Sequence, residues 1–422
     1  MRPGKAGFAA LTGFVELINP ALITSLKVIG LQHTLNEINM DTQELYNLSP
    51  TIRLMLMGLV VAIGPLAWVW LRNRKAPVAR RLQMLTLVTL FLTFDLVVFG
   101  AFTRLTDSGL GCPDWPGCYG HASPVGAQLH IEAAQTAMPS GPVTQPKAWV
   151  EMIHRYLATG VGVMILTLAL VSWLDRKRVH ISPWWPTFTL LWVCLQGAFG
   201  ALTVTMKLFP AIVTLHLLGG MALLALLKVQ AVRYTQAQGG QPYVLLASGT
   251  RWLLLATFGL LWLQIALGGW VSTNYAVLAC TQFPGCQNSM WPDMDFRLGF
   301  TLWRELGAGL DGENITFAAL TAIHYVHRLS AYVVFAAILA LTLKLYRVPE
   351  LRRQAQWLGG LALLQLATGL GNVLLGWPLA AAVLHTGGAA GLVVVLTGVV
   401  FCTRSAFVAV HRSKLSASRL TA

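Results

Sequence analysis

The amino-acid sequence predicts an all-α integral membrane protein: two tandem four-helix bundles related by a parallel, pseudo-twofold repeat, plus one extra N-terminal helix. Three observations support this fold class. The chain is 55% hydrophobic and only 11% charged, whereas soluble domains carry roughly 25% charged residues. It contains nine apolar stretches that each approach the length of about 20 residues needed to cross a bilayer. A motif at 112–118, "CPDWPGC", returns at 280–286 as "CTQFPGC".

The apolar stretches set the order of elements along the chain. Helices are expected at 51–71, 82–103, 149–173, 185–206, 211–232, 251–273, 317–343, 355–375 and 379–403. The domains that follow are an N-terminal extension (1–50), the extra helix with a basic linker (51–81), the first bundle (82–232), a linker (233–250), the second bundle (251–403) and a basic tail (404–422). Residues 1–40 lack a charged start followed by a compact apolar core, so no cleavable signal peptide is expected. Met40 is an alternative start.

The distribution of basic residues predicts the orientation in the membrane. Of the 30 Lys and Arg residues, 19 fall in five segments: 72–81, 176–178, 228–251, 344–353 and 404–419. The alternate loops, 104–148 and 274–316, are poor in basic residues. Because basic loops stay on the cytoplasmic side, both cysteine-containing loops are expected on the periplasmic side of a bacterial inner membrane. The net charge of +14 is explained by topology, and nucleic-acid binding is not indicated.

The repeat extends beyond the cysteine motif. The segment "EMIHRYLATGVGV" at 151–163 parallels "HYVHRLSAYVVF" at 324–335, and both share a central His-Arg. Gln196 precedes His216 by twenty residues, as Gln365 precedes His385. Each bundle has an even number of helices, so both have the same orientation, which makes the repeat parallel.

Four histidines occupy matching places in the two bundles: His154 and His216 in the first, His327 and His385 in the second. Ionisable groups inside membrane helices are costly and usually functional. Two imidazoles on facing helices, without a thiolate or carboxylate cluster, suit axial ligation of a haem iron. Zinc fits less well because only two ligands per bundle are visible. The glycines near these histidines would either admit a flat macrocycle or simply allow close helix packing.

Charged neighbours of the histidines suggest further roles. Arg155 and Arg328 directly follow two of them and are candidates to contact haem propionates. Glu151 lies one helical turn before His154, where the second bundle has His324. A carboxylate beside a haem pocket is a candidate to handle protons or stabilise a cation, which predicts one catalytic pocket and one electron relay. The alternative is that Glu151 only bonds Arg155 or lies in the membrane interface.

Each cysteine motif is expected to close a local disulfide, Cys112 with Cys118 and Cys280 with Cys286. The two cysteines of a motif are six residues apart with a Pro-Gly turn between them, and an extracytoplasmic space lets such pairs persist. A structural staple and a redox role both remain open.

Taken together, the E-x-x-H-R at 151–155, the H-x-x-H-R at 324–328, the two later histidines, the "GAFTRLTDSGLGCPDWPGC" loop and the duplication resemble haem A synthase over residues 82–403. The resemblance implies oxidation of a methyl group of haem O to the formyl group of haem A. The inserted oxygen would come from water, and the electrons would pass to a membrane acceptor. Glu151 would be the catalytic carboxylate. His154 and His216 would ligate the substrate haem, and His327 and His385 a permanent haem B.

The resemblance also implies partners. These are the haem O substrate, membrane lipid, haem O synthase, a quinone or other membrane electron acceptor, and a further copy of the chain. The Cys112–Cys118 pair matches the family's outer-loop disulfide. The second cysteine pair and the extra helix depart from the simplest family pattern and resemble variants in some proteobacterial branches.

Two rival functions are carried forward. A thiol–disulfide/quinone oxidoreductase would centre on the cysteines, although Cys-x5-Cys is not the usual redox spacing. A di-haem electron carrier of the cytochrome b type would have equivalent bundles, which the difference between Glu151 and His324 disfavours. A transporter lacks the broken helices expected at mid-membrane.

Overall fold

The computed structural model describes residues 49–405 apart from 180, 240–242 and 310–312. Nearly all of the expected N-terminal extension and basic tail, and the alternative start at Met40, lie outside the described residues. By their contacts, the residues divide into two units, 1–52 and 53–422. The fold described below is that of the second unit, together with the first turn of the helix that opens it.

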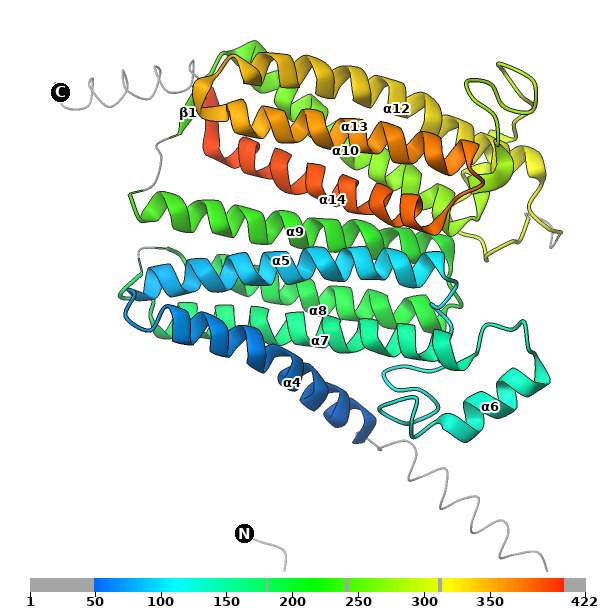
Figure 1. Cartoon of the computed structure of the whole chain (residues 1–422), viewed down its shortest axis with the longest axis horizontal. Helices are drawn as coiled ribbons and strands as arrows, with labels where there is room; N and C mark the ends of the chain where they lie inside the picture. Colours follow the sequence, from blue (N-terminus) through cyan, green and yellow to red (C-terminus); the bar gives the residue numbers. More distant parts are fainter. Residues whose placement is uncertain (1–48, 180, 240–242, 310–312, 406–422) are drawn as a thin grey trace, which may run out of the picture. The chain divides into compact units, whose positions relative to one another are not determined.

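Nine helices among the described residues are long and apolar enough to cross a membrane, as predicted. They are α4 (Ser49–Arg72), α5 (Val78–Leu105), α7 (Gln145–Leu174), α8 (Trp184–Thr205), α9 (Pro210–Ala237), α10 (Ser248–Thr273), α12 (Phe317–Tyr346), α13 (Arg352–Leu374, directly preceded by the 3-10 turn η2, Pro349–Leu351) and α14 (Leu379–Cys402). The chain is therefore an all-α, multi-pass membrane protein, and the fold-class prediction is confirmed. Figure 1 shows these helices running side by side.

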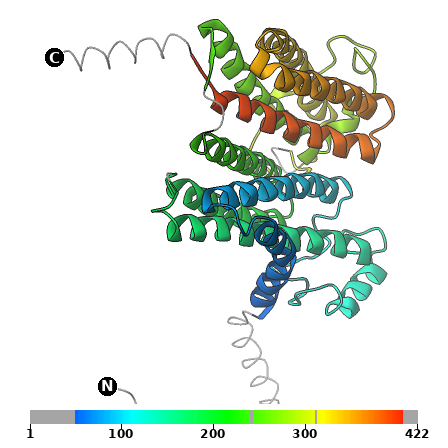
Figure 2. The ribbon, with the colours of Figure 1, turned by 60° about the vertical axis from the view of Figure 1, so that its left-hand side comes forward.

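The helices form two groups with the same order of contacts. In the first bundle, α5 and α8 each pack against both α7 and α9. In the second, α10 and α13 each pack against both α12 and α14. The bundles meet where α9 contacts α14 and α10, and where α5 contacts α14. Figure 2 shows the two bundles side by side from a second direction. This pattern is what a twofold repeat would produce, and the symmetry axis itself stays a prediction.

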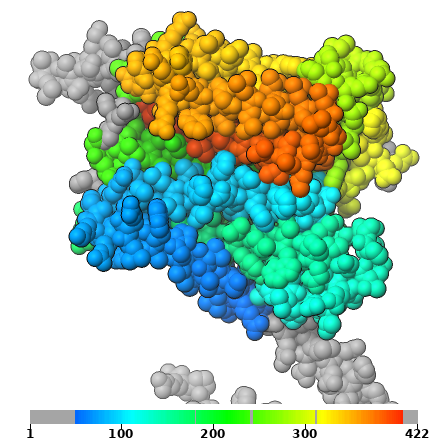
Figure 3. Space-filling view, viewed as in Figure 1, coloured from blue at the N-terminus to red at the C-terminus, as the bar shows by residue number. Residues whose placement is uncertain are grey.

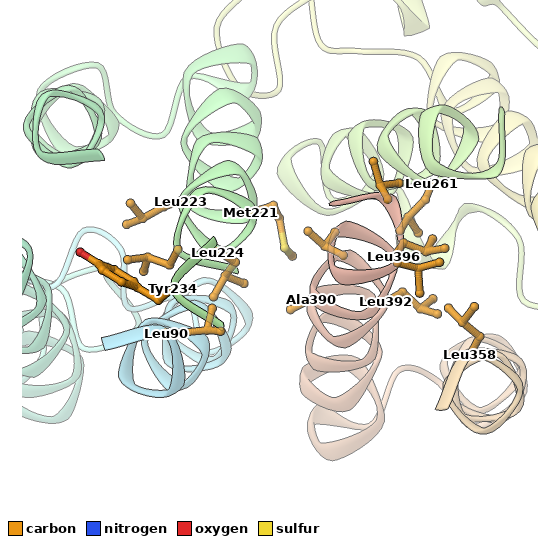
Figure 4. Close-up of a cluster of buried hydrophobic side chains, with 14 of the residues drawn as sticks. Leu90, Met221, Leu223, Leu224, Tyr234, Leu261, Leu358, Ala390, Leu392 and Leu396 are labelled. Atoms are coloured by element: carbon orange, nitrogen blue, oxygen red, sulfur yellow. The ribbon is translucent and has the colours of Figure 1, made fainter. Parts of the chain in front are cut away.

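One apolar core runs through both bundles. Met221 and Leu224 of α9 belong to the same buried cluster as Ala390 and Leu396 of α14, and Figure 4 shows Met221 pointing from α9 towards α14. In lipid, helix association depends on such close packing and on hydrogen bonds between helices. The core therefore fixes the bundles relative to each other.

Helix α4 packs against α7 through small residues. A Cβ placed on Gly160 of α7 would lie 2.9 Å from a methyl carbon of Val61 on α4. Gly58 of α4 faces Thr159 of α7 more closely still. Small residues at a helix crossing let two backbones approach in a membrane, which explains how the extra helix joins the first bundle.

The structure adds elements that the apolar pattern did not predict. Helix α6 (Gln128–Ala137) lies in the first outer loop, and η1 (Ala276–Ala279) and α11 (Phe296–Gly299) lie in the second. Strands β1 (Val244–Leu246) and β2 (Thr403–Ser405) form a short parallel pair. Figures 1 and 3 show both outer loops extending from the same end of the helices.

Candidate functional site

Each outer loop is closed by the predicted local disulfide. The S–S distances are 2.04 Å for Cys112–Cys118 and 2.01 Å for Cys280–Cys286. The second cysteine of each pair starts a tight turn, in which the N–H of Cys118 donates to the carbonyl of His121 at 2.7 Å. The N–H of Cys286 donates in the same way to the carbonyl of Ser289 at 2.9 Å. The two loops are therefore built alike.

One arginine below each loop binds its backbone. Nη1 of Arg155 donates to the carbonyls of Asp114 at 3.0 Å, Pro116 at 3.1 Å, and Gly117. Arg328 holds the second loop through the corresponding carbonyls, at 2.8 Å from Gln282, 3.4 Å from Pro284 and 2.9 Å from Gly285. A planar guanidinium presents several donors in fixed directions, so each arginine fixes a whole turn. The contact of Arg155 and Arg328 with haem propionates stays a prediction.

Glu151 connects the first loop to the helix that carries His154. Its side chain is only 6% exposed. One carboxylate oxygen accepts the N–H of Cys112 at 2.8 Å, and the other is ion-paired with Nη2 of Arg155. The bond to Arg155 that the alternative reading required is thus present. The backbone of Gly111 is a third partner, and because a carboxylate has about four acceptor positions, one position remains for a further hydrogen bond.

The second bundle has a neutral counterpart at this position. His324 is 6% exposed, and its Nδ1 lies 3.0 Å from the carbonyl of Ala276. A second guanidinium nitrogen of Arg328, Nη2, donates to the carbonyl of Cys280 at 3.3 Å, and Arg328 has no carboxylate partner among the described residues. The two sites therefore share their loop and arginine and differ in the charge one turn before the histidine.

The structure brings the four sequence-predicted histidines together in pairs. His154 on α7 lies close enough to His216 on α9 for their charges to interact, and His327 on α12 interacts likewise with His385 on α14. All four are half-buried. The pairs arise because α7 and α9, like α12 and α14, sit in corresponding places within their bundles.

A glycine lies against every one of these imidazole rings. A Cβ on Gly100 would lie 3.0 Å from Nε2 of His154, and one on Gly268 would lie 2.9 Å from Cε1 of His327. Gly200 and Gly369 stand in the same relation to the other two rings, His216 and His385, at 3.5 and 3.4 Å. The absence of a side chain at these positions leaves space around each ring that larger residues would fill.

The donor set fits a haem. Among the described residues, no group of three or more His, Cys, Asp or Glu could hold a metal ion alone. Two imidazoles instead complete the coordination of an iron whose other four ligands come from a porphyrin. Glycine-lined imidazole pairs between helices are consistent with such a group, and the role of these residues as iron ligands stays a prediction.

Sequence reasoning missed two side chains beside the second histidine pair. Gln264 lies 3.1 Å from Nδ1 of His327, and the Thr368 hydroxyl lies 2.9 Å from Nδ1 of His385. Their partners are distant in sequence, so no local pattern marked them. A comparison of the two repeats position by position would have found them, because these polar residues correspond to apolar residues in the first bundle.

Fold and site together define a multi-pass helical membrane protein with paired histidines below two disulfide-closed loops. Comparison with known proteins identifies the family to which the chain belongs. Residues 83–397 match the family model described as cytochrome oxidase assembly protein. The chain therefore belongs to the family of cytochrome oxidase assembly proteins that includes the haem A synthases.

Individual relatives agree with the family match. A haem A synthase of Shewanella oneidensis is 37% identical over 75% of this chain and 94% of its own length. Another from Mesorhizobium japonicum is 30% identical over 71% of this chain and 84% of its own. A third, from Caulobacter vibrioides, is 28% identical over 72% of this chain and 91% of its own. The resemblance seen in the motifs is thus confirmed at the level of the family.

Proposed function

We propose that the protein is a haem A synthase, which oxidises a methyl group of haem O to the formyl group of haem A. The relatives named above carry this activity in their names. The structural observation that favours chemistry over electron transfer alone is the charge difference between two otherwise similar sites. Glu151 stands where the second bundle has His324.

The two histidine pairs take different haems in this proposal. His154 and His216 hold the substrate, haem O, next to Glu151. His327 and His385 hold haem B, which supplies one-electron transfer when bound there. The farnesyl tail of the substrate requires an apolar surface, and a helix bundle open to lipid provides one.

Glu151 is proposed to act on the reacting methyl carbon. Each of the two oxidations removes two electrons and two protons, and water supplies the oxygen. A buried carboxylate stabilises positive charge that develops on the carbon and accepts a proton from the attacking water. The N–H of Cys112 and the guanidinium of Arg155 hold the carboxylate in one orientation, so no reorganisation is needed when the charge develops.

The electrons leave through a membrane acceptor such as a quinone, with haem B as relay. Supply of the substrate calls for a haem O synthase in the same membrane. The site, under the disulfide-closed loops, lies on the periplasmic side of a bacterial inner membrane in this proposal. The distribution of Lys and Arg between alternate loops supports this orientation.

Glu151→Gln tests the carboxylate because glutamine keeps the size of the side chain and its amide oxygen can still accept the N–H of Cys112. The variant is produced together with a haem O synthase, and its haems are extracted and identified. We expect haem B to be retained and haem O or its alcohol to accumulate. The matched control is His324→Gln in the second bundle, for which we expect haem A. Normal haem A production by Glu151→Gln would overturn the role of the carboxylate. Absence of haem A from the wild-type protein would overturn the enzyme itself.

A further inference from the structure

An imidazole that binds iron through Nε2 leaves its other nitrogen, Nδ1, available for a hydrogen bond. The two histidine pairs differ in the hydrogen-bond partners of Nδ1. In the second pair, both Nδ1 atoms have a side-chain partner: Thr368 Oγ1 at 2.9 Å for His385 and Gln264 Nε2 at 3.1 Å for His327. In the first pair, Nδ1 of His216 is buried and has no side-chain hydrogen-bond partner among the described residues, although the backbone of Gln196 lies beside the ring. His154 instead stacks on Phe99, with ring centroids 6.3 Å apart.

Thr368 does more than contact the ring of His385, because it selects the tautomer. Its hydroxyl donates to the carbonyl of Leu364 at 2.7 Å. A hydroxyl has a single proton, so towards His385 the oxygen acts as an acceptor. Nδ1 of His385 therefore carries the hydrogen, and Nε2 keeps the lone pair that an iron needs. Metal-bound histidines are commonly fixed in this way by a partner on the other nitrogen.

Gln264 fixes the position of the other ring. Its amide lies 3.1 Å from both Nδ1 and the backbone carbonyl of His327, so it joins α10 to α12 at the ligand itself. Because the NH2 group donates to that carbonyl, it is the NH2 group and not the oxygen that faces Nδ1 of His327. Gln264 thus anchors the ring of His327 to α10, and it does not select the tautomer that iron binding through Nε2 requires.

The glycines beside the rings identify the counterparts of these residues in the first bundle. Gly369 faces His385 as Gly200 faces His216, so the residue that corresponds to Thr368 is Phe199. Gly268 faces His327 as Gly100 faces His154, so the residue that corresponds to Gln264, four positions earlier, is Leu96. Neither phenylalanine nor leucine can bind an imidazole nitrogen.

We propose that Thr368 is a positioning residue that presets His385 of the second pair for permanent haem coordination, while Phe199 leaves His216 of the first pair free to accept and release its haem. This inference rests on the proposed function, in which one haem is retained and the other is exchanged as substrate and product. It assigns the difference between the two sites to Thr368 and Phe199.

The test uses the full chain, purified in detergent and loaded with haem B, in a His216→Ala background. There only the second pair provides two imidazoles, so the low-spin spectrum reports that pair alone. Thr368→Val removes the hydroxyl at nearly constant shape, and Thr368→Ser keeps it. Two quantities are measured: the rate of haem transfer to excess apomyoglobin and the midpoint potential of the low-spin haem.

We expect Thr368→Val to lose haem faster by about tenfold or more, because partners of metal-bound histidines contribute 10–100-fold to affinity. Its midpoint potential should rise, because an imidazole without the Nδ1–H···O bond donates less charge to ferric iron. Thr368→Ser should match the parent in both quantities. Equal haem loss and equal potential in all three proteins would overturn the positioning role while leaving the proposed function intact. A parent protein that binds no haem B would overturn both.

A gain-of-function variant tests the same inference in the other bundle. Phe199→Thr, in a His385→Ala background, introduces a hydroxyl beside His216. We expect haem B to leave the first site more slowly and its midpoint potential to fall. Unchanged kinetics and potential would contradict the assignment even if Thr368→Val failed to fold.

Discussion

Tyr275 donates a hydrogen bond of 2.7 Å to Asp107, the residue 168 positions before it. Arg104 makes a second contact over the same interval, with Nη2 donating to the carbonyl of Ser272 at 2.6 Å. The cysteine motifs at 112 and 280 are also 168 residues apart. When a position contacts its own counterpart, both lie close to a twofold axis. The contact between Asp107 and Tyr275 therefore supports the predicted repeat and joins the bundles at their outer end.

Substitution of Tyr275 should weaken this junction in two measurable steps. Tyr275→Phe removes the hydrogen bond to Asp107 and keeps the ring over which the guanidinium carbon of Arg104 lies at 4.1 Å. Both partners are partly exposed, so we expect a loss of about 1 kcal/mol in stability. Tyr275→Ala should cost about 0.5–1 kcal/mol more for the cation–π contact, together with lost packing. Thermal unfolding in detergent measures both. Equal melting temperatures for wild type and Tyr275→Ala would contradict the junction.

The same tyrosine predicts a pH dependence. Burial raises the pKa of Tyr275 above its usual value, with Arg104 lowering it and Asp107 raising it. The neutral phenol is the donor to Asp107, so its stabilisation is present below the unfolded pKa of about 10 and is lost as pH rises through the raised value. Stability measured between pH 8 and 11 should fall less in Tyr275→Phe than in the wild type. Identical slopes would refute this assignment.

The two loop arginines should differ in their importance for stability. Arg155→Met leaves Glu151 buried and unpaired, and breaking a buried ion pair from one side costs about 3–5 kcal/mol. Arg328→Met leaves only loop carbonyls without partners, about 1–3 kcal/mol. Unfolding midpoints compare the two matched variants. The double variant Glu151→Gln/Arg155→Met should be more stable than the sum of the single effects indicates, and strict additivity would argue against the pair.

Removal of each cysteine pair separates the two loops by function. Replacement of either pair by alanine opens a small loop, at a cost of about 2 kcal/mol. Only the first loop binds the carboxylate, through the N–H of Cys112. We therefore expect Cys112→Ala/Cys118→Ala to reduce haem A formation and Cys280→Ala/Cys286→Ala to leave it nearly unchanged, with haem absorbance retained in both. Loss of all activity in both variants would favour redox chemistry at the disulfides.

The orientation in the membrane is tested by labelling single introduced cysteines. The background carries Cys194→Ala and Cys402→Ala, so that no free thiol remains in the helices. Ala133 is exposed on α6. A cysteine introduced there by Ala133→Cys should react with a membrane-impermeant maleimide added to spheroplasts. Lys177→Cys, exposed in the basic segment between α7 and α8, should react only after the membrane is opened. The reverse pattern would overturn the periplasmic placement of the cysteine loops.

The sequence predicted the helices well because their signal is local. Apolar composition over about 20 residues is sufficient to mark a membrane helix, and all nine expected helices are present among the described residues. The observed helix ends differ by a few residues from the ends of the apolar stretches, because capping residues determine where a helix begins and ends. Helix α7, for example, begins at Gln145, after Thr144 accepts the N–H of Lys147, while the apolar stretch begins at 149.

Most contacts between residues distant in the chain could not be predicted from the sequence. The local disulfides were predicted because each pair spans only six residues. The carbonyls that Arg155 binds lie 38 to 41 residues away, and nothing near Arg155 in sequence indicates them. Helix α6 was missed because it is amphipathic and short, without the apolar length of the others. The pairing of His154 with His216 was expected because the second and fourth helices of one bundle run in the same direction and can face each other across its core.

The central claim is tested most directly by the haems that the protein carries. The full chain is purified from membranes that also contain a haem O synthase, and its extracted haems are identified by chromatography and mass. The account predicts haem B together with haem A, with haem O or its alcohol as remaining substrate and intermediate. Haem B alone, even when haem O is supplied, would contradict the synthase and favour a di-haem electron carrier, and a protein without haem would contradict both.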